Sequence, residues 1–306
     1  MWLRFCNLLI AIKDAIKSVK FMKTQKVLFI TGASSGFGLE IAKTALENGD
    51  KVIATVRSKP EDLAVSLNNH PNLLITVMDV SNEEQVQYAV ASGLLAFGKI
   101  DVLINNAGFG IITAIEEATD AEVKQQYETN VFGLLNVTRA VLPYMRKNRA
   151  GHIINFSSLF GFDAIPGWGL YGSTKFAVEG LSKGLAVELE PLGIKVTAVE
   201  PGLFRTAFLS AGSFGVSKNV IDDYQKNVGP MRSAGDTLHG KQPGDPKKLA
   251  RVVVELAHSE NPPVQLPIGK DSIGMFRKSA EKTTAIIKEW ESVSGNTDFS
   301  DAQNML

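Results

Sequence analysis

Short apolar runs rich in β-branched residues alternate with longer amphipathic stretches between residues 27 and 200 of this chain. Strands that are apolar along their whole length are typical of parallel sheets covered by helices on both faces. Because crossovers between parallel strands are right-handed, the alternation predicts an α/β fold built on a doubly wound parallel sheet. The predicted strands are VLFIT (27–31), KVIATV (51–56), LLITVMDV (73–80), DVLIN (101–105), HIINFS (152–157) and IKVTAVE (194–200).

The stretches between the strands carry helical patterns, and Gly49 follows the first of them in the usual position after a helix C-terminus. No Pro/Gly/Ser-rich linker and no repeat interrupts residues 27–200, so we expect one domain over 27–270. An extension (1–26) would precede this domain, and a helix pattern (272–291) within a C-terminal segment (271–306) would follow it. The predicted helices are Gly38–Asn48, Asn82–Phe97, Asp120–Lys147 and Tyr171–Glu190.

Charge and cysteine usage exclude several classes of protein. The 32 basic and 32 acidic residues give a net charge of zero, so the chain has no overall positive field to hold a nucleic acid. Cys6 is the only cysteine, which excludes an intramolecular disulfide and a cysteine-rich metal site and is typical of a reducing, cytoplasmic location. The four histidines lack metal-ligand spacing, so we expect no metal: they are His70, His152, His239 and His258.

The first residues form a basic amphipathic pattern unlike the rest of the chain. Lys13, Lys17 and Lys20 share one face of a predicted helix, and the apolar run on the other side is too short to span a bilayer. Residues 1–21 would either lie on a membrane surface or partner, or form an extension without a role ahead of an alternative start at Met22. We favour the extension. The apolar positions are Trp2, Phe5, Leu8, Leu9, Ile12, Ile16 and Val19.

The pattern loosens after Pro201-Gly202. Residues 203–245 are rich in glycine and carry scattered apolar side chains, among them Phe204, Phe208, Leu209 and Phe214. Long segments of this kind in compact domains often cover a site, and aromatic residues would be costly to leave in water. We therefore predict a lid over 203–245.

A glycine-rich turn, TGASSGFG (31–38), follows the first predicted strand and opens the first predicted helix. Gly32 can adopt backbone angles closed to other residues, Gly36 lets the main chain approach a ligand, and Gly38 lets the helix pack on the sheet. Free N–H groups at the helix start suit a pyrophosphate, and the hydroxyls of Ser34 and Ser35 add donors. The turn predicts dinucleotide binding on a Rossmann fold.

The end of the second strand favours NADP(H) over NAD(H). NAD-binding sites of this type place a carboxylate there to hold the ribose, but this chain has Val56 followed by Arg57. The planar guanidinium of Arg57 can pair with a 2′-phosphate. NAD stays open, because an arginine at a strand end is also a common solvated residue.

Tyr171 and Lys175 in YGSTK stand four residues apart at the start of a predicted helix, so they share a face. A tyrosine with an ordinary pKa near 10 is a poor acid or base at neutral pH, and a nearby ammonium would lower that pKa. Ser158 ends the fifth predicted strand, at the sheet edge where such folds bind ligands, and its hydroxyl could donate to a carbonyl oxygen.

These motifs together resemble the short-chain dehydrogenase/reductase family of the common single-domain type, over about Val27 to Thr206 with a weaker tail. Each motif is common alone, but their combination and order are specific. In sequence order they are TGASSGFG (31–38), Asp79-Val80, Asn105-Asn106-Ala107-Gly108, Asn130, Ser158, YGSTK (171–175) and Pro201-Gly202.

The resemblance implies catalytic roles for four residues. Tyr171 would be the general acid in reduction and the base in oxidation, and Lys175 would lower its pKa and hold the nicotinamide ribose. Ser158 would orient and polarise the carbonyl. Asn130 would support a helix distortion and a water in the proton relay.

The resemblance also implies a set of cofactor contacts. Asp79 and Val80 would contact the adenine, although Asp79 has the alternative of capping a helix. Asn105 and Asn106 have the alternative of satisfying only backbone groups. The full set is Gly32, Ser34, Ser35, Gly36, Phe37, Gly38, Arg57, Asp79, Val80, Asn106, Ala107, Gly108, Tyr171, Lys175, Pro201, Gly202 and Thr206.

We therefore expect an NADP(H)-dependent oxidoreductase that interconverts a carbonyl and an alcohol, with an apolar substrate. The alternative is a regulator that binds NADP(H) and senses its redox state without turnover. Family members are usually homodimers or homotetramers, often through helices corresponding to 120–147 and 171–190. The substrate pocket would be built from 158–168, 109–115 and the lid, with the apolar side chains Phe160, Phe162, Ile165, Trp168, Phe204, Phe208 and Phe214.

Overall fold

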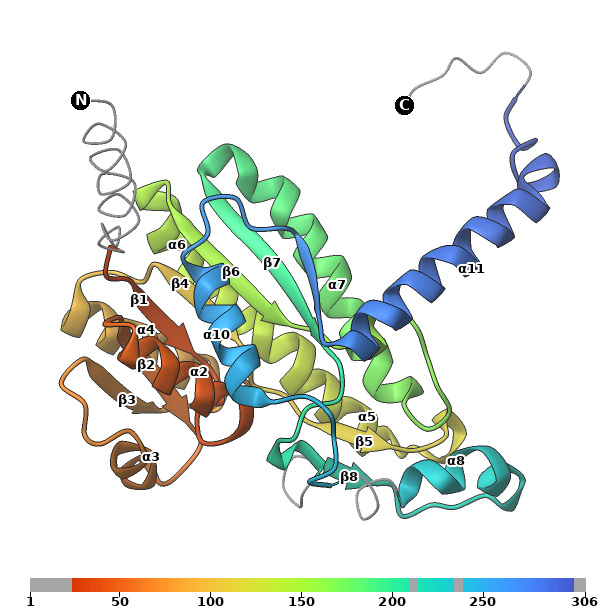
Figure 1. The fold of residues 1–306 in the computed structure, drawn as a ribbon, viewed down its shortest axis with the longest axis horizontal. Coiled ribbons are helices and arrows are strands. Elements are labelled where there is room, and N and C mark those ends of the chain that lie inside the picture. Colours follow the sequence, from red (N-terminus) through yellow and green to blue (C-terminus); the bar gives the residue numbers. More distant parts are fainter. Residues whose placement is uncertain (1–23, 210–213, 234–238, 300–306) are drawn as a thin grey trace, which may run out of the picture.

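The computed structural model describes residues 24–209, 214–233 and 239–299, and they form an α/β structure around one seven-stranded sheet (Figure 1). The strand order is β3-β2-β1-β4-β6-β7-β9, and every neighbouring pair is parallel. The order reverses between β1 and β4, which confirms the predicted doubly wound fold. The strands are β1 Val27–Ile30, β2 Lys51–Val56, β3 Leu73–Val77, β4 Val102–Asn105, β6 Gly151–Phe156, β7 Ile194–Pro201 and β9 Gln265–Ile268.

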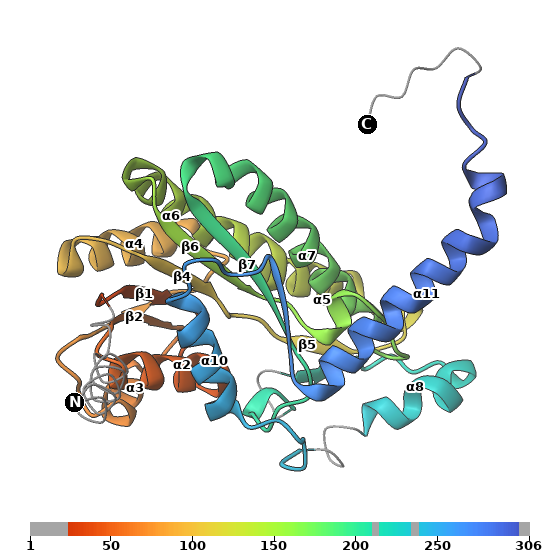
Figure 2. The same cartoon turned by 45° about the horizontal axis from the view of Figure 1, so that its top comes forward.

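Helices cover both faces of this sheet. The core on one face joins α2 and α10, and the core on the other joins α4, α6 and the end of α7 (Figures 1 and 2). The inner strands of the sheet and β2 are almost wholly buried between these layers, which explains their continuous apolar sequences. The helices are α2 Gly36–Glu47, α3 Pro60–Ser66, α4 Glu83–Phe97, α5 Asp120–Tyr127, α6 Leu134–Asn148, α7 Gly169–Leu189, α8 Gln225–Arg232, α10 Pro246–Ala257 and α11 Lys270–Ser294.

Three elements differ from the sequence expectation. Strand β9 is short and contains Pro267, so its sequence lacks the apolar run of the other strands. A second parallel sheet pairs β5 (Gly110–Ile112) with β8 (Phe214–Val216). The prediction of one continuous helix over 120–147 was wrong, because a π-helical turn, Glu128–Gly133, separates α5 from α6.

Helix α11 leaves the body of the protein, as Figure 2 shows, and is longer than the predicted 272–291. Its first half packs on the body, where Phe276 contacts Phe162 edge to face. The amphipathic pattern of 1–21, with Cys6, lies outside the described residues, as do 210–213 and 234–238 of the predicted lid. Among the described residues, no helix is both long and apolar enough to cross a membrane.

Candidate active site

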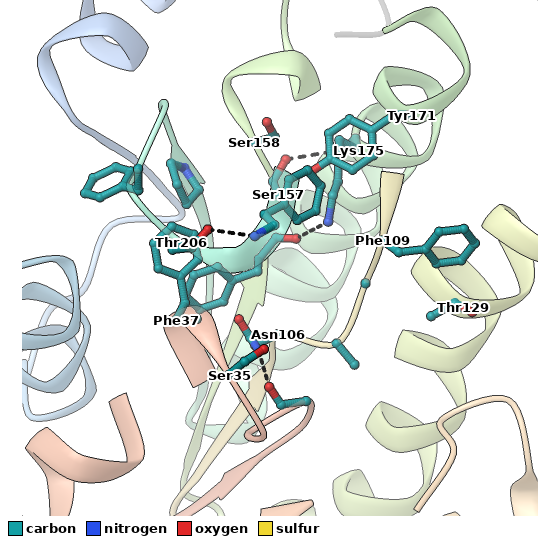
Figure 3. A pocket seen from close by; sticks show the side chains of 18 of the residues that line it. Ser35, Phe37, Asn106, Phe109, Thr129, Ser157, Ser158, Tyr171, Lys175 and Thr206 are labelled. Carbon is teal, nitrogen blue, oxygen red and sulfur yellow. Dashed lines mark hydrogen bonds between the residues drawn. The ribbon is translucent and has the colours of Figure 1, made fainter. Parts of the chain in front are cut away.

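A cleft opens at the carboxyl ends of the central strands, where the strand order reverses (Figure 3). It brings together residues from β1 to β7 that lie more than a hundred positions apart in the sequence. All the predicted site residues except Gly38 and Asn130 line this cleft. Lining residues that the sequence did not predict include Thr55, Met78, Thr129, Phe156 and Ser157. Thr55 and Met78 could have been predicted to line the cleft, because each lies at the carboxyl end of a predicted parallel strand.

The glycine-rich turn forms one wall of the cleft. Gly32 and Gly36 have φ angles of +67° and +56°, which other residues rarely adopt. A Cβ on Gly38 would lie 2.3 Å from the Gly32 carbonyl oxygen and 2.7 Å from Asn106 Nδ2, so Gly38 is needed for packing beneath the turn. Ser35 precedes α2 and makes no side-chain cap, so the first N–H groups of that helix face the cleft with no side-chain acceptor from this residue.

Asn106 both lines the cleft and supports this turn. Its Nδ2 donates to the carbonyl oxygens of Thr31 and Gly32 at 2.9 and 3.0 Å. Asn105 points elsewhere: its Nδ2 donates to Thr138 Oγ1 and Asn155 Oδ1 inside the protein. Asn106 therefore satisfies backbone carbonyl groups, as the alternative interpretation expected, but it also lines the cleft. Asn105 instead bonds to buried side chains.

Polar groups at the ends of β2 and β3 form the far end of the cleft. Arg57 is exposed there, at the end of β2. Asp79 accepts hydrogen bonds from the main-chain N–H and hydroxyl of Ser81. The cap of α4 is Asn82, which accepts from the N–H of Gln85, so the alternative that Asp79 caps this helix was wrong.

Ser158, Tyr171 and Lys175 converge at the other end, with exposed fractions of 8%, 7% and 6% (Figure 3). Tyr171 and Lys175 lie one turn apart near the start of α7, and Ser158 follows β6. Lys175 Nζ donates to the carbonyl oxygen of Phe156 at 2.8 Å and lies 5.5 Å from the centre of the Tyr171 ring. The three predicted side chains therefore share one buried corner of the cleft.

The electrostatics of this corner differ from the expectation for Tyr171. Burial raises the pKa of Tyr171 above its usual value, and a hydrogen bond with Ser158 only partly opposes this. Burial lowers the pKa of Lys175 to about 8, against the opposing charge of Glu179. The expected lowering of the tyrosine pKa by the lysine is wrong for this structure, in which desolvation dominates. Tyr171 is thus a neutral phenol at neutral pH and a weaker acid than an exposed tyrosine.

Asn130 lies behind the cleft, in the π-helical turn. Its Nδ2 donates to the carbonyl oxygen of Phe109 at 2.9 Å and to Thr174 Oγ1 at 3.1 Å, and its Oδ1 accepts from the N–H of Phe109. A Cβ on Gly133 would lie 2.4 Å from Val80 Cγ2, so the end of the same turn packs tightly against the loop after β3. The predicted helix distortion at Asn130 is present, and the water relay stays a prediction.

Aromatic side chains form the wall beside Tyr171. Phe160 stacks on Trp168 with ring centres 4.8 Å apart, and Phe208 lies 5.7 Å from the Tyr171 ring. Three of the predicted apolar residues pack behind the wall rather than lining the cleft: Phe162, Ile165 and Phe214. Phe204 lines the cleft on the opposite side, where it packs edge to face on Phe37 of the glycine-rich turn. It therefore borders the dinucleotide end rather than the substrate end.

A buried carboxylate fastens residues 214–233, one described segment of the predicted lid, to the body. Glu117 Oε2 accepts from the N–H of Ala114 at 2.9 Å and Oε1 accepts from the N–H of Ile221 at 2.8 Å. Arg232 Nη2 donates to both oxygens, and the Glu117 side chain is fully buried. Burial raises the pKa of Glu117, but the hydrogen bonds from Ile221, Arg232 and Ala114 outweigh it and lower the pKa overall.

Glu117→Gln is expected to loosen this lid, because a neutral amide cannot accept from all these donors. Removing one partner of a buried ion pair costs about 3 kcal/mol, which urea unfolding would measure. Proteolysis within 214–233 should become faster. The matched control is Glu116→Gln, whose exposed carboxylate accepts from the Tyr224 hydroxyl at the surface. Equal proteolysis of both variants would show that Glu117 does not fasten the lid.

Comparisons with known proteins agree with this geometry. A family model of short chain dehydrogenases matches residues 26–213. The chain is 40% identical over 271 residues to the oxidoreductase BOA17 of Botryotinia fuckeliana, covering 88% of this chain and 98% of that protein. It is also 40% identical over 255 residues to a 3-ketodihydrosphingosine reductase of Bacteroides thetaiotaomicron, covering 83% and 91%.

Solved structures give the same result. A short-chain dehydrogenase from Streptomyces avermitilis is 39% identical, with a TM-score of 0.83 over 90% of this chain and 99% of that one. ElxO with NADP bound has a TM-score of 0.68 at 29% identity, over 82% and 100%. The 3-ketoacyl-(acyl-carrier-protein) reductase from Brucella melitensis, in complex with NADH, has a TM-score of 0.68 at 30% identity, over 82% and 99%. Similar proteins therefore bind nicotinamide cofactors of both kinds.

Proposed function

The chain belongs to the short-chain dehydrogenase family of oxidoreductases, and from this we propose that it interconverts a carbonyl and an alcohol with NADP(H). The observation that carries the proposal is the convergence of Ser158, Tyr171 and Lys175 in one buried corner of the cleft that the glycine-rich turn borders. A protein that only senses a nucleotide has no need of a buried acid beside an apolar pocket.

The cleft fits a nicotinamide dinucleotide. A Cβ on Gly36 would point across the cleft to within 3.6 Å of Thr206 Cβ, so the turn keeps a narrow passage open for a ligand. The N–H groups at the start of α2 would hold the pyrophosphate, and Lys175 would hold the nicotinamide ribose. Arg57 would pair with a 2′-phosphate, which favours NADP(H).

The chain's own groups act on the substrate oxygen. When bound, the nicotinamide supplies or accepts the hydride. Ser158 and Tyr171 would donate hydrogen bonds to the carbonyl oxygen, where negative charge develops as the carbonyl is reduced. Tyr171 would then give up its proton to that oxygen, and the ammonium of Lys175 would stabilise the phenolate left behind. In oxidation the same groups would act in reverse.

The proposed substrate is an apolar ketone, aldehyde or secondary alcohol. Phe160, Trp168 and Phe208 line the cleft around Tyr171 and offer no charged group to the substrate. The similar reductase named for 3-ketodihydrosphingosine gives one such compound to test. Acetophenone and a long-chain aldehyde would represent the aromatic and aliphatic alternatives.

The test is NADPH oxidation by the purified protein with these carbonyls, followed by absorbance. Turnover with at least one apolar carbonyl, and none with a charged analogue of the same compound, is the expected result. Tight NADPH binding without consumption of any compound would favour the sensing regulator instead.

Arg57→Ala is expected to raise the KM for NADPH about tenfold, the effect of losing about 1.4 kcal/mol of charge-assisted bonding. The KM for NADH should change little, because NADH lacks the 2′-phosphate. Lys43→Ala removes an exposed cation on α2 outside the cleft and serves as the control. Equal losses for the two cofactors, or a wild-type preference for NADH, would contradict the assignment of NADP(H).

A further inference from the structure

Two buried glutamates lie behind the site, and the proposed reaction assigns no role to either of them. Glu179 comes from α7 and Glu200 from β7, with exposed fractions of 5% and 0%. Gln265 on β9 bridges them, since its Nε2 donates to Glu179 Oε2 at 2.8 Å and to Glu200 Oε1 at 3.1 Å. Two carboxyl groups thus share one amide in the interior.

Their remaining oxygens are under-satisfied. Glu179 Oε1 and Glu200 Oε2 are both buried and have no hydrogen-bond partner among the described residues. Two ionised carboxylates in this position would repel each other and would each bear a large desolvation cost. A single proton between them removes one charge and supplies one donor.

The groups around the pair support this protonation state. Burial, followed by the charge of Glu179, raises the pKa of Glu200 to about 8. A hydrogen bond between the two carboxyl groups acts in the same direction, while Gln265 and the ammonium of Lys183 on α7 oppose it. From α11, Ser272 donates to the main-chain oxygen of Glu200 rather than to its carboxyl group. At neutral pH Glu200 therefore holds the proton, and the charge of Glu179 acts on Lys175.

The charged member lies next to the reacting groups. Glu179 follows Lys175 by one helical turn, on the same face of α7, and its charge raises the pKa of that buried lysine. It also underlies the loop that carries Ser158: a Cβ on Gly161 would lie 2.4 Å from Ser157 Oγ and 3.3 Å from Glu179 Oε1. Lys175 is buried and bonded to a neutral carbonyl, so it depends on a counter-charge to stay an ammonium ion.

We propose that Glu179 and Glu200 are a positioning pair that holds one proton and presents a single negative charge, which keeps Lys175 an ammonium ion behind Tyr171. The pair does not touch substrate. The part of this proposal that concerns turnover rests on the proposed function. The shared proton does not, because it is a property of the folded chain alone.

The test of charge compares two variants of nearly the same shape. Glu200→Gln replaces a neutral acid by a neutral amide and leaves the charge on Glu179, so kcat at pH 7 should stay within about twofold of wild type. The double variant Glu179→Gln, Glu200→Gln removes the charge. The alkaline limb of its kcat profile for acetophenone, or for the best carbonyl of the panel, should move about one pH unit lower, with KM little changed.

The test of the shared proton needs no activity. A carboxyl whose pKa is raised by folding stabilises the protein below its unfolded pKa and loses that stabilisation as the pH rises toward 8. The free energy of unfolding of wild type should therefore fall relative to that of Glu200→Gln between pH 5 and 8. In urea unfolding, the midpoint of wild type minus the midpoint of the variant should decrease over this range. Groups common to both proteins cancel in this difference.

The outcomes separate the two proposals. A constant midpoint difference from pH 5 to 8 would overturn the shared proton, and identical alkaline limbs for the single and double variants would overturn the effect on Lys175. A pH-dependent midpoint difference in a protein that turns over no carbonyl would support the shared proton and contradict the proposed function. Equal loss of stability and activity in both variants at every pH would indicate a structural role only, and would also overturn the proposal.

Discussion

Tyr171→Phe is expected to lower kcat for carbonyl reduction by about 100- to 10,000-fold, the range that a general acid contributes. The change removes only the hydroxyl. The ring packs between Phe160, Trp168 and Phe208, and phenylalanine keeps these contacts. Fluorescence titration should therefore show NADPH binding close to that of wild type, and the loss should appear in kcat.

Tyr127→Phe is the matched control. Its hydroxyl donates to Ser173 Oγ at 3.0 Å on the neighbouring turn of α7, and Tyr127 does not line the cleft. This variant makes the same chemical change at a short distance and should keep kcat within about twofold. Wild-type kcat in Tyr171→Phe would mean that another group supplies the proton.

Gly38→Ala is expected to give the largest structural effect. A Cβ at this position would lie 2.3 Å from the Gly32 carbonyl oxygen and 3.0 Å from Ala33 Cα, and neither backbone atom can move without shifting the turn. Overpacking of this kind costs about 1–3 kcal/mol of unfolding free energy. A displaced turn should also weaken NADPH binding at least about tenfold, equivalent to ~1.4 kcal/mol.

Gly184→Ala adds the same methyl group as Gly38→Ala but is expected to stabilise the protein instead of destabilising it. Gly184 lies in the exposed part of α7, and a Cβ added there would have no described neighbour within 4 Å, so alanine should stabilise the helix by about 0.5–1 kcal/mol. Urea unfolding and cofactor titration of the two variants measure both effects. If Gly38→Ala unfolds and binds NADPH like wild type, the close packing of the turn is not what requires glycine there.

Much of the fold was predictable because the buried parallel strands carry continuous apolar sequences, which are typical of a parallel sheet covered by helices on both faces. Strand β9 escaped prediction because its four residues include a glutamine and a proline. The glutamine, Gln265, bonds both buried glutamates, and no local pattern connects it with partners 65 and 86 residues away. The apolar pattern of 120–147 did not indicate the π-helical turn between α5 and α6, and only the family resemblance, through Asn130, predicted a distortion there.

The site was predictable where position along a strand decides it. Residues at the carboxyl ends of β1, β4 and β6 had to meet at one edge, and they do. Electrostatics were not predictable in the same way. The direction of the Tyr171 pKa depends on how deeply the ring is buried and on where the Lys175 ammonium points, and both are properties of the assembled structure. The homo-oligomer expected through α5, α6 and α7 stays a prediction.

Hydride transfer is the central claim, and a label tests it most directly. NADPH carrying deuterium at both positions of nicotinamide C4 would be incubated with the wild-type protein and an apolar ketone, and the alcohol product analysed by mass spectrometry. We expect deuterium on the carbinol carbon, in an amount equal to the NADPH consumed, and almost none with Tyr171→Phe. Bound NADPH that is never oxidised, or an alcohol formed without the label, would contradict the account.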